Sequence, residues 1–240
     1  MEYAVLFLPL FGAILGYSVK YFGDIYSQLT TCLFVCLTAF ISIVLFYNGI
    51  FYSSYGNFII YEWIASGNFI INWSVNIDPL SSIMLVVVTV VSALVHIYSI
   101  GYMKDDPDKS RFMSYLSLFT FSMLTLVTSD NFLQLFFGWE GVGLCSYFLI
   151  GFWFKRETAN AAAIKAFLVN RVGDFGLALG IFLIFYMCGT INYDEVFQQI
   201  STLSQSELNF LGINLNPINL ICILLFIGAM GKSAQLFLHT

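Results

Sequence analysis

Ionisable side chains lie inside stretches of sequence that are otherwise apolar, among them Glu140, Arg171, Asp174 and Lys232. A charge near the middle of a membrane-spanning helix costs about 2.5 to 3.5 kcal/mol, so such groups need either a compensating partner or a chemical use. Burial favours their neutral forms, whereas attraction between an acid and an amine favours the charged forms. An acid and an amine for which these effects nearly balance can bind and release a proton. The residue types therefore point to proton transfer within a membrane.

A purely structural role is the alternative for the same residues, which would then form permanent ion pairs that hold helices together. Arg171 and Asp174 lie one helical turn apart, and for them structural pairing is as good a prediction as a functional one. Glu140 and Lys232 lie on different predicted helices, and a buried ion pair is a costly way to join two helices. For these two residues we favour proton transfer.

The composition places these residues in a membrane protein. Of the 240 residues, 59% are hydrophobic and only 10% are charged, which excludes a water-soluble globule. The sequence predicts an all-α fold, a polytopic transmembrane bundle of about seven helices, with the last one incomplete. The predicted helices are Tyr3–Val19, Thr30–Tyr47, Leu80–Tyr102, Phe112–Thr128, Asn131–Phe154, Asn160–Cys188 and a seventh from Ile218 to the C-terminus.

Local signals refine the helix boundaries and the loop before the third helix. Asp78 and Asn216 each precede a proline, which is the expected start of a helix because proline needs no N–H partner there. Apolar and polar residues alternate over 69–77, a period of two that predicts a strand. A turn at Gly67, with Ser66 and Asn68 beside it, would pair this strand with residues 58–64 in a short β-hairpin.

Glycines gather near the ionisable residues. Small residues allow helices to approach closely, and we interpret most of these glycines as packing positions. They are Gly138, Gly141, Gly143, Gly176, Gly180, Gly228 and Gly231. The four tryptophans, Trp63, Trp73, Trp139 and Trp153, are expected to include anchors at the membrane interface.

Basic residues predict the orientation of the bundle, because they are enriched in loops on the cytoplasmic or matrix side. Loops one, three and five carry such residues, and loops two, four and six carry none. The basic loop residues are Lys20, Lys104, Lys109, Arg111, Lys155 and Arg156. The N-terminus is therefore expected on the opposite, outer side.

Metal and redox sites are not predicted. The five cysteines lie inside apolar runs without C-x-x-C spacing or paired clusters, which excludes the usual patterns of disulfide frameworks, zinc sites and iron–sulfur ligation. The net charge of −5 is distributed over many loops and indicates no nucleic-acid partner. We expect no cofactor and no metal in this chain.

Four segments resemble a known family. They are VSALVHIYSIGYM (91–103), NFLQLFFGWEGVGLCSYFLIGFW (131–153), ANAAAIKAFLVNRVGDFGLALG (159–180) and GAMGKSAQ (228–235). They are similar to chain 5 of respiratory complex I, the proton-pumping NADH:ubiquinone oxidoreductase, and the resemblance extends over essentially all 240 residues. The strings GWEGVG and NRVGD are specific to that chain.

The resemblance implies an antiporter-like subunit that couples NADH:ubiquinone electron transfer to proton pumping. At matching positions, Glu140 is the acidic partner on the fifth helix, Asp174 is a further functional carboxylate, and Lys232 is the central lysine of a broken seventh helix. Arg171 is a weaker candidate in the same motif. Residues 1–111 would form three N-terminal helices with the outer hairpin loop, and residues 112–240 would form the first part of the antiporter-like repeat.

The resemblance also implies partners and a location. NADH, FMN, iron–sulfur clusters and ubiquinone belong to other subunits of that enzyme, so this chain would be part of a reductase without a redox site of its own. Expected partners are membrane lipids, other membrane-arm subunits, especially the antiporter-like chain 4, and a second polypeptide that carries the rest of the subunit. The amino-acid usage is typical of AT-rich genomes, and together with the resemblance it predicts that the chain lies in the mitochondrial inner membrane. A bacterial plasma membrane is the alternative location.

Two other functions are compatible with the same residues. An Mrp-type cation/proton antiporter component shares the acid and the lysine but differs in the sequence around them. A structural fragment of the membrane arm would keep the helices without pumping protons. An antiporter would transport ions in vesicles without NADH. With a scaffold, pumping per electron would not change when Glu140 or Lys232 is replaced.

Overall fold

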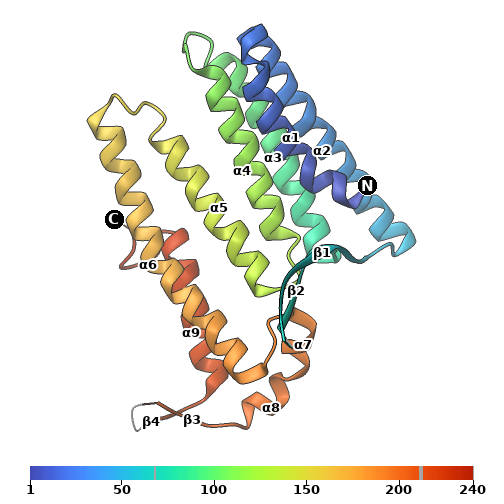
Figure 1. The fold of residues 1–240 in the computed structure, drawn as a ribbon, viewed down its shortest axis with the longest axis vertical. Coiled ribbons are helices and arrows are strands. Elements are labelled where there is room, and N and C mark those ends of the chain that lie inside the picture. The colour runs from blue at the N-terminus through green and yellow to red at the C-terminus, as the bar shows by residue number, and fades with distance from the viewer. Residues whose placement is uncertain (68, 211–212, 240) are drawn as a thin grey trace.

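Long helices that run side by side make up most of the molecule (Figure 1). The computed structural model describes residues 1–67, 69–210 and 213–239. Its elements are α1 (Glu2–Ser18), the 3-10 helix η1 (Val19–Phe22), α2 (Asp24–Tyr52), β1 (Gly56–Ser66), β2 (Phe69–Ile77), α3 (Pro79–Tyr102), α4 (Lys109–Val127), α5 (Phe132–Ile150), α6 (Glu157–Cys188), α7 (Tyr193–Gln198), α8 (Ile200–Ser204), β3 (Leu208–Phe210), β4 (Ile213–Leu215) and α9 (Pro217–Lys232). The predicted all-α bundle with a small hairpin is confirmed.

Within the described residues, five helices are long and apolar enough to cross a membrane: α1 with η1, α2, α3, α5 and α6. The segments predicted as the fourth and seventh spans are also helical, as α4 and α9. Helix α9 has only 16 residues, and α4 is rich in serine and threonine, which lowers its hydropathy. Much of this polar content is turned inward, since Ser114, Ser117, Thr120 and Thr125 are buried.

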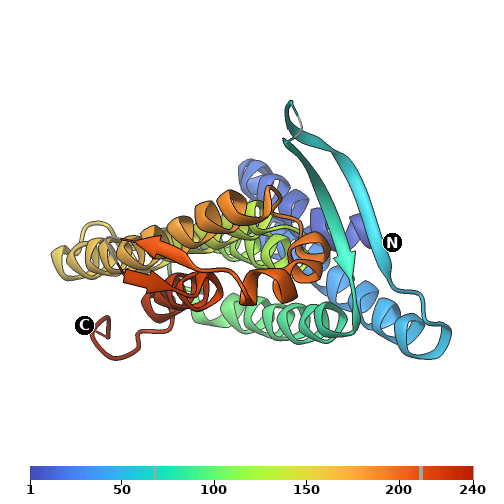
Figure 2. The ribbon, with the colours of Figure 1, turned by 90° about the horizontal axis from the view of Figure 1, so that it is seen from below.

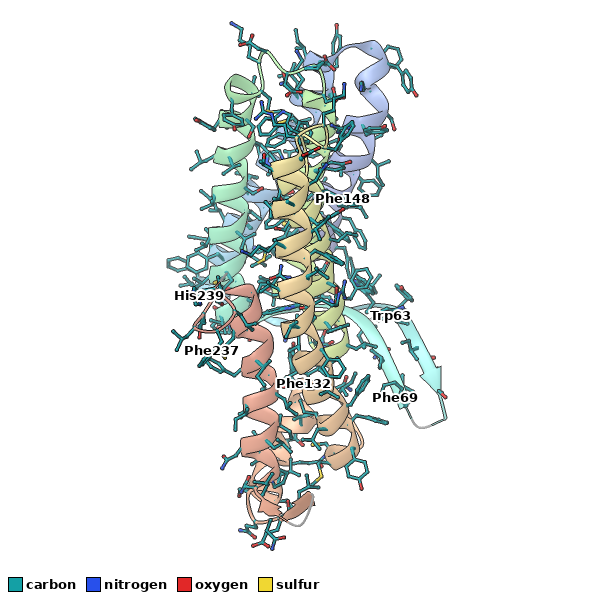
Figure 3. The ribbon with its side chains drawn as sticks, turned by 90° about the vertical axis from the view of Figure 1, so that its left-hand side faces the viewer. Trp63, Phe69, Phe132, Phe148, Phe237 and His239 are labelled. Carbon is teal, nitrogen blue, oxygen red and sulfur yellow. The ribbon has the colours of Figure 1, made fainter. Side chains whose placement is uncertain are left out.

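The prediction that the seventh helix continues to the end of the chain is wrong, because α9 stops at Lys232. The Ser233 N–H still donates to the Ala229 carbonyl, but Ala234 and Phe237 then adopt positive φ values of 49° and 77°, which are incompatible with a right-handed helix. Figure 3 shows the irregular tail, with Phe237 and His239, beside the end of α9. Thr240 lies outside the described residues.

Both helix starts predicted before a proline are confirmed. The Asp78 carboxylate accepts a hydrogen bond from the Ser81 N–H at 2.6 Å, and the Ser81 hydroxyl accepts one from the Asp78 N–H at 2.7 Å. This reciprocal capping box satisfies backbone donors at the start of α3. The Asn216 side chain caps α9 by accepting from the Ile218 N–H at 3.0 Å.

The predicted hairpin is confirmed and is longer than expected. β1 and β2 pair antiparallel from Gly56 opposite Ile77 to Ser66 opposite Phe69. Gly67 turns the chain with a φ of 60°, a left-handed conformation that costs glycine little; Asn68, predicted beside it, lies outside the described residues. Figure 2 shows the hairpin extending past one side of the helices. The apolar residues of the alternating pattern from Ile71 to Ile77 are buried, and Ser74 between them is buried as well.

A junction at Asn131 joins the hairpin, the start of α5 and the segment after α6. Its side-chain oxygen accepts from the Gln134 N–H at 2.8 Å, and its Nδ2 donates to the Asn72 carbonyl at 3.0 Å. Its backbone pairs with Asn192 in an isolated antiparallel bridge. On either side, the Phe132 N–H donates to the Ile191 carbonyl, and another backbone hydrogen bond joins residues 193 and 130. The junction therefore fixes one end of α5 to one end of α6.

Gln134 is expected to be essential for docking the hairpin. Its side chain is fully buried and forms two hydrogen bonds with the backbone of Ser74, accepting from the N–H at 3.1 Å and donating to the carbonyl at 2.7 Å. Gln134→Leu would leave both backbone groups of Ser74 unpaired, at a cost of about 1 to 3 kcal/mol for each. We expect faster hydrogen exchange over β2 in the purified protein. Gln198→Leu, at an exposed position of α7, is the control, and equal exchange rates in both variants would contradict the prediction.

The helices form two adjoining groups. α1 packs against α2 and α4, α2 against α3, and α3 against α4, whereas α5 packs between α4 and α6, and α9 lies along α6 (Figure 1). Predicted packing glycines lie at these contacts: a Cβ on Gly138 of α5 would lie 2.6 Å from the backbone nitrogen of Leu126 in α4, and a Cβ on Gly231 of α9 would lie 2.9 Å from the Cα of Gly173 in α6. Close approach brings α5, α6 and α9 together at the polar residues described next.

Candidate proton-transfer site

The four predicted site residues come from three neighbouring helices and meet around one turn of α5. Glu140 lies on α5, Arg171 and Asp174 lie on α6, and Lys232 is the last residue of α9. Arg171 contacts Glu140, and both Asp174 and Lys232 contact the residue before it, Trp139. The structure therefore joins in one cluster residues that are up to 92 positions apart in the sequence, from 140 to 232.

Arg171 pairs with Glu140 across the interface between α5 and α6. Its Nη1 donates to Oε1 of Glu140 at 2.6 Å, and its guanidinium carbon lies 4.8 Å from the ring centre of Phe167, one turn earlier on α6. Within the described residues, Arg171 therefore does not form the ion pair with Asp174 that was one of two equally weighted predictions for it. The long Arg171 side chain reaches the neighbouring helix instead and is about half exposed, at 49%.

Asp174 is the most buried of the four residues, with 5% of its surface exposed. Its Oδ1 accepts a hydrogen bond from the indole Nε1 of Trp139 at 2.8 Å. An indole N–H is a donor only, so this bond holds the carboxyl oxygen in place and the indole cannot take up its proton. Asp174 is thus positioned by α5 although it belongs to α6.

Lys232 contacts the same tryptophan through a different group. Its Nζ donates to the backbone carbonyl of Trp139 at 2.6 Å and lies 5.0 Å from the centre of the Trp139 ring, within the range of a cation–π interaction. Within the described residues, no ion pair joins Lys232 to a carboxylate, so Glu140 and Lys232 do not form the permanent pair of the structural alternative.

Glycine at position 143 leaves room for the amine. A Cβ on Gly143 would lie 3.2 Å from Nζ of Lys232, closer than ordinary van der Waals contact. On the other side of the cluster, Gly173 of α6 lies opposite Gly231 of α9, the residue before Lys232. Gly143 therefore makes room on α5 for the amine, and Gly173 with Gly231 allows α9 to approach α6 closely.

Two further residues, Trp139 and Gly143, contact the cluster and are not among the site residues predicted from the sequence. Trp139 was grouped with interface anchors, and Gly143 was assigned to packing. Both residues belong to the motif GWEGVG, and this was the signal available in the sequence. Trp139 is directly beside Glu140, and Gly143 is one helical turn after Trp139. In the part of the chain that the structure describes, no three His, Cys, Asp or Glu side chains come together as metal ligands.

The fold has a counterpart among solved structures. A chain of the membrane-bound sulfane sulfur reductase, an archaeal respiratory membrane complex, superimposes with a TM-score of 0.76 at 19% identity, over 96% of this chain and 44% of that chain. At this level of identity the similarity concerns the fold alone.

The sequence matches two family descriptions and many curated proteins. Residues 63–113 match "NADH-Ubiquinone oxidoreductase (complex I), chain 5 N-terminus", and residues 129–240 match "NADH:quinone oxidoreductase/Mrp antiporter, TM". NADH-ubiquinone oxidoreductase chain 5 is 51% identical in Triticum aestivum and 48% identical in Chondrus crispus, and NADH-quinone oxidoreductase subunit L of Rhodobacter capsulatus is 48% identical, each over 100% of this chain. The chain spans only 35–36% of the length of these relatives. It belongs to the chain 5 (subunit L) family of complex I.

Proposed function

We propose that this chain takes part in proton translocation as a membrane-arm subunit of complex I, coupled to electron transfer from NADH to a quinone. The cluster of Glu140, Arg171, Asp174 and Lys232 is the observation that carries the proposal. Four ionisable groups from three helices meet in a chain whose helices are long and apolar enough to span a membrane. Such groups are expensive in a membrane and usually mark ion or proton pathways.

The contacts suggest different roles for the two sides of the cluster. Glu140 is compensated by a direct ion pair with Arg171, whereas Lys232 is held by a neutral carbonyl and a ring face. The lysine can therefore lose its proton without leaving an unpaired carboxylate behind, and Asp174 is the nearby acid that pairs with no cation among the described residues. We assign Lys232 and Asp174 to proton exchange, and Glu140 with Arg171 to control of the local field.

The redox chemistry is assigned to other subunits, which would bind NADH, FMN, iron–sulfur clusters and ubiquinone. The proposed partners are other membrane-arm subunits, with the antiporter-like chain 4 as a neighbour, a second polypeptide carrying the rest of the subunit, and membrane lipids. Mass spectrometry of the purified complex should detect chain 4 and the second polypeptide. The proposed location is the mitochondrial inner membrane, with the N-terminus on the intermembrane side; relatives occur in bacteria as well as in mitochondria.

Glu140→Gln in the assembled complex tests the proposal. The substitution preserves shape but removes the charge that Arg171 compensates, and we expect fewer protons pumped per electron in sealed membranes driven by NADH. Glu62→Gln, an exposed position on β1, is the control. Pumping per electron equal to that of the unmodified complex would favour a scaffold. Cation exchange by the vesicles without NADH would favour an antiporter.

A further inference from the structure

Trp139 contacts two ionisable residues on two different helices through three separate features. Its indole N–H binds Asp174 of α6 at 2.8 Å, its carbonyl binds the amine of Lys232 of α9 at 2.6 Å, and its ring centre lies 5.0 Å from the same amine. The side chain therefore lies between a carboxylate and an amine that do not form an ion pair with each other.

We propose that Trp139 is a positioning residue for proton transfer, which holds Asp174 and Lys232 in one hydrogen-bonded unit on α5. This inference rests on the proposed function. Through its N–H the indole fixes one oxygen of Asp174, and that bond fixes the orientation of the ring. The ring face then lies where the Lys232 amine meets the helix backbone. The orientation of the ring thus links the position of the acid to that of the amine.

Tryptophan is the side chain that suits both contacts. Phenylalanine offers a ring face without a donor, whereas tryptophan combines an N–H donor with the aromatic face that binds cations best. The carbonyl is different, because it belongs to the backbone and survives any substitution at this position. Replacing Trp139 therefore tests the indole N–H and the ring separately from the backbone contact with Lys232.

Gly143 completes the unit by leaving space for the amine one helical turn after Trp139. In a continuous helix the carbonyl of residue 139 also accepts the N–H of residue 143, so both groups lie on the side of α5 that Lys232 approaches. A methyl group at position 143 would lie 3.2 Å from Nζ and would displace the amine by a few tenths of an ångström. Gly143→Ala thus disturbs the lysine without touching the indole.

The experiment compares Trp139→Phe with Trp153→Phe in the intact complex. Trp153 is a matched control, because its Nε1 also donates to a carboxylate at 2.8 Å, that of Asp106, and its ring centre lies 5.1 Å from the Arg156 guanidinium carbon. These contacts lie in the connections between helices, outside the cluster. The readouts are the amount of assembled complex, the protons pumped per electron, and the pH dependence of pumping.

We expect Trp139→Phe to lower pumping per electron and to displace the pH profile by about one unit, a tenfold change in proton affinity. Trp153→Phe should leave both unchanged. In the double variant Trp139→Phe, Asp174→Asn, pumping should fall by less than the two single variants predict together, because part of the effect of the indole acts through that carboxyl group. Gly143→Ala is a second variant in case Trp139→Phe fails to assemble, with Gly101→Ala as its control since a Cβ there meets nothing within 4 Å.

The outcomes separate this inference from the proposed function. If Glu140→Gln lowers pumping per electron, while Trp139→Phe and Gly143→Ala leave both that ratio and the pH profile as in the unmodified complex, Trp139 has only a structural role and the inference is overturned. If Glu140→Gln and Lys232→Ala also leave pumping unchanged, the proposed function itself is overturned. A displaced pH profile in Trp139→Phe but not in Trp153→Phe supports the positioning role.

Discussion

Lys232→Ala is expected to reduce proton pumping per electron by about tenfold or more. The amine donates to the Trp139 carbonyl at 2.6 Å and lies over the indole ring, and alanine removes the only ionisable group that α9 contributes to the cluster. A hydrogen bond to a charged group is worth about 1.5 to 3 kcal/mol, which corresponds to a factor of about ten or more at 1.36 kcal/mol per tenfold change. The measurement is acidification by sealed membranes, normalised to NADH oxidation.

Lys155→Ala is the control for this variant. Lys155 is an exposed cation in the connection between α5 and α6, so its loss changes the net charge by the same amount without touching the cluster. Lys232→Arg adds a further comparison, because arginine keeps the charge but cannot release its proton at physiological pH. Full pumping per electron in either Lys232 variant would contradict a proton-exchanging role for this residue.

Gly138→Val should have the largest effect on stability. A Cβ at this position would lie 2.6 Å from the backbone nitrogen of Leu126 and 2.8 Å from its Cα. Overpacking usually costs about 1 to 3 kcal/mol, and here the obstacle is the backbone of α4, which cannot rotate away as a side chain could. We expect α4 and α5 to separate and the thermal stability and yield of the assembled complex to fall.

Gly101→Val is the matched control for overpacking, because a Cβ on Gly101 in α3 meets nothing within 4 Å. Both variants replace a helical glycine with valine, so both change the helix propensity in the same direction. A difference between them therefore measures the contact between α4 and α5. Equal yields and equal melting temperatures for the two complexes would show that this contact tolerates a side chain.

The sequence was informative where a local rule decides the structure. Asp78 and Asn216 begin helices because their side chains accept backbone N–H bonds two or three residues later, which is a property of a few neighbouring residues. The hairpin was predictable for the same reason, since the alternation from residue 69 to residue 77 follows the two-residue repeat of a strand. Such features do not depend on which helix lies beside which.

The partners inside the site could not be predicted in the same way. Apolar runs give the depth of a residue along its own helix, but not the direction in which its side chain points relative to other helices. Arg171 therefore looked suited to Asp174 on the same helix, whereas the structure pairs it with Glu140 on α5. The contacts of Trp139 with Asp174 and Lys232 likewise depend on how α6 and α9 pack around α5.

Apolar runs also could not predict where α9 ends or the structure of the segment between α6 and α9. The residues after Lys232 remain partly apolar, so hydropathy extends the helix, while positive φ values at Ala234 and Phe237 end it. The short helices α7 and α8 between α6 and α9 were not anticipated, because six and five residues are too few to show a reliable helical period.

The junction at Asn131 has a mechanical consequence for the site. It fastens one end of α5 to the segment that follows α6, so a relative tilt of the two helices pivots about that end. At about 1.5 Å per residue, Glu140 lies about 12 Å from Phe132, where α5 begins. A tilt of about ten degrees would then shift the Glu140 carboxylate by about 2 Å, enough to break its 2.6 Å contact with Arg171 while the pivot stays closed.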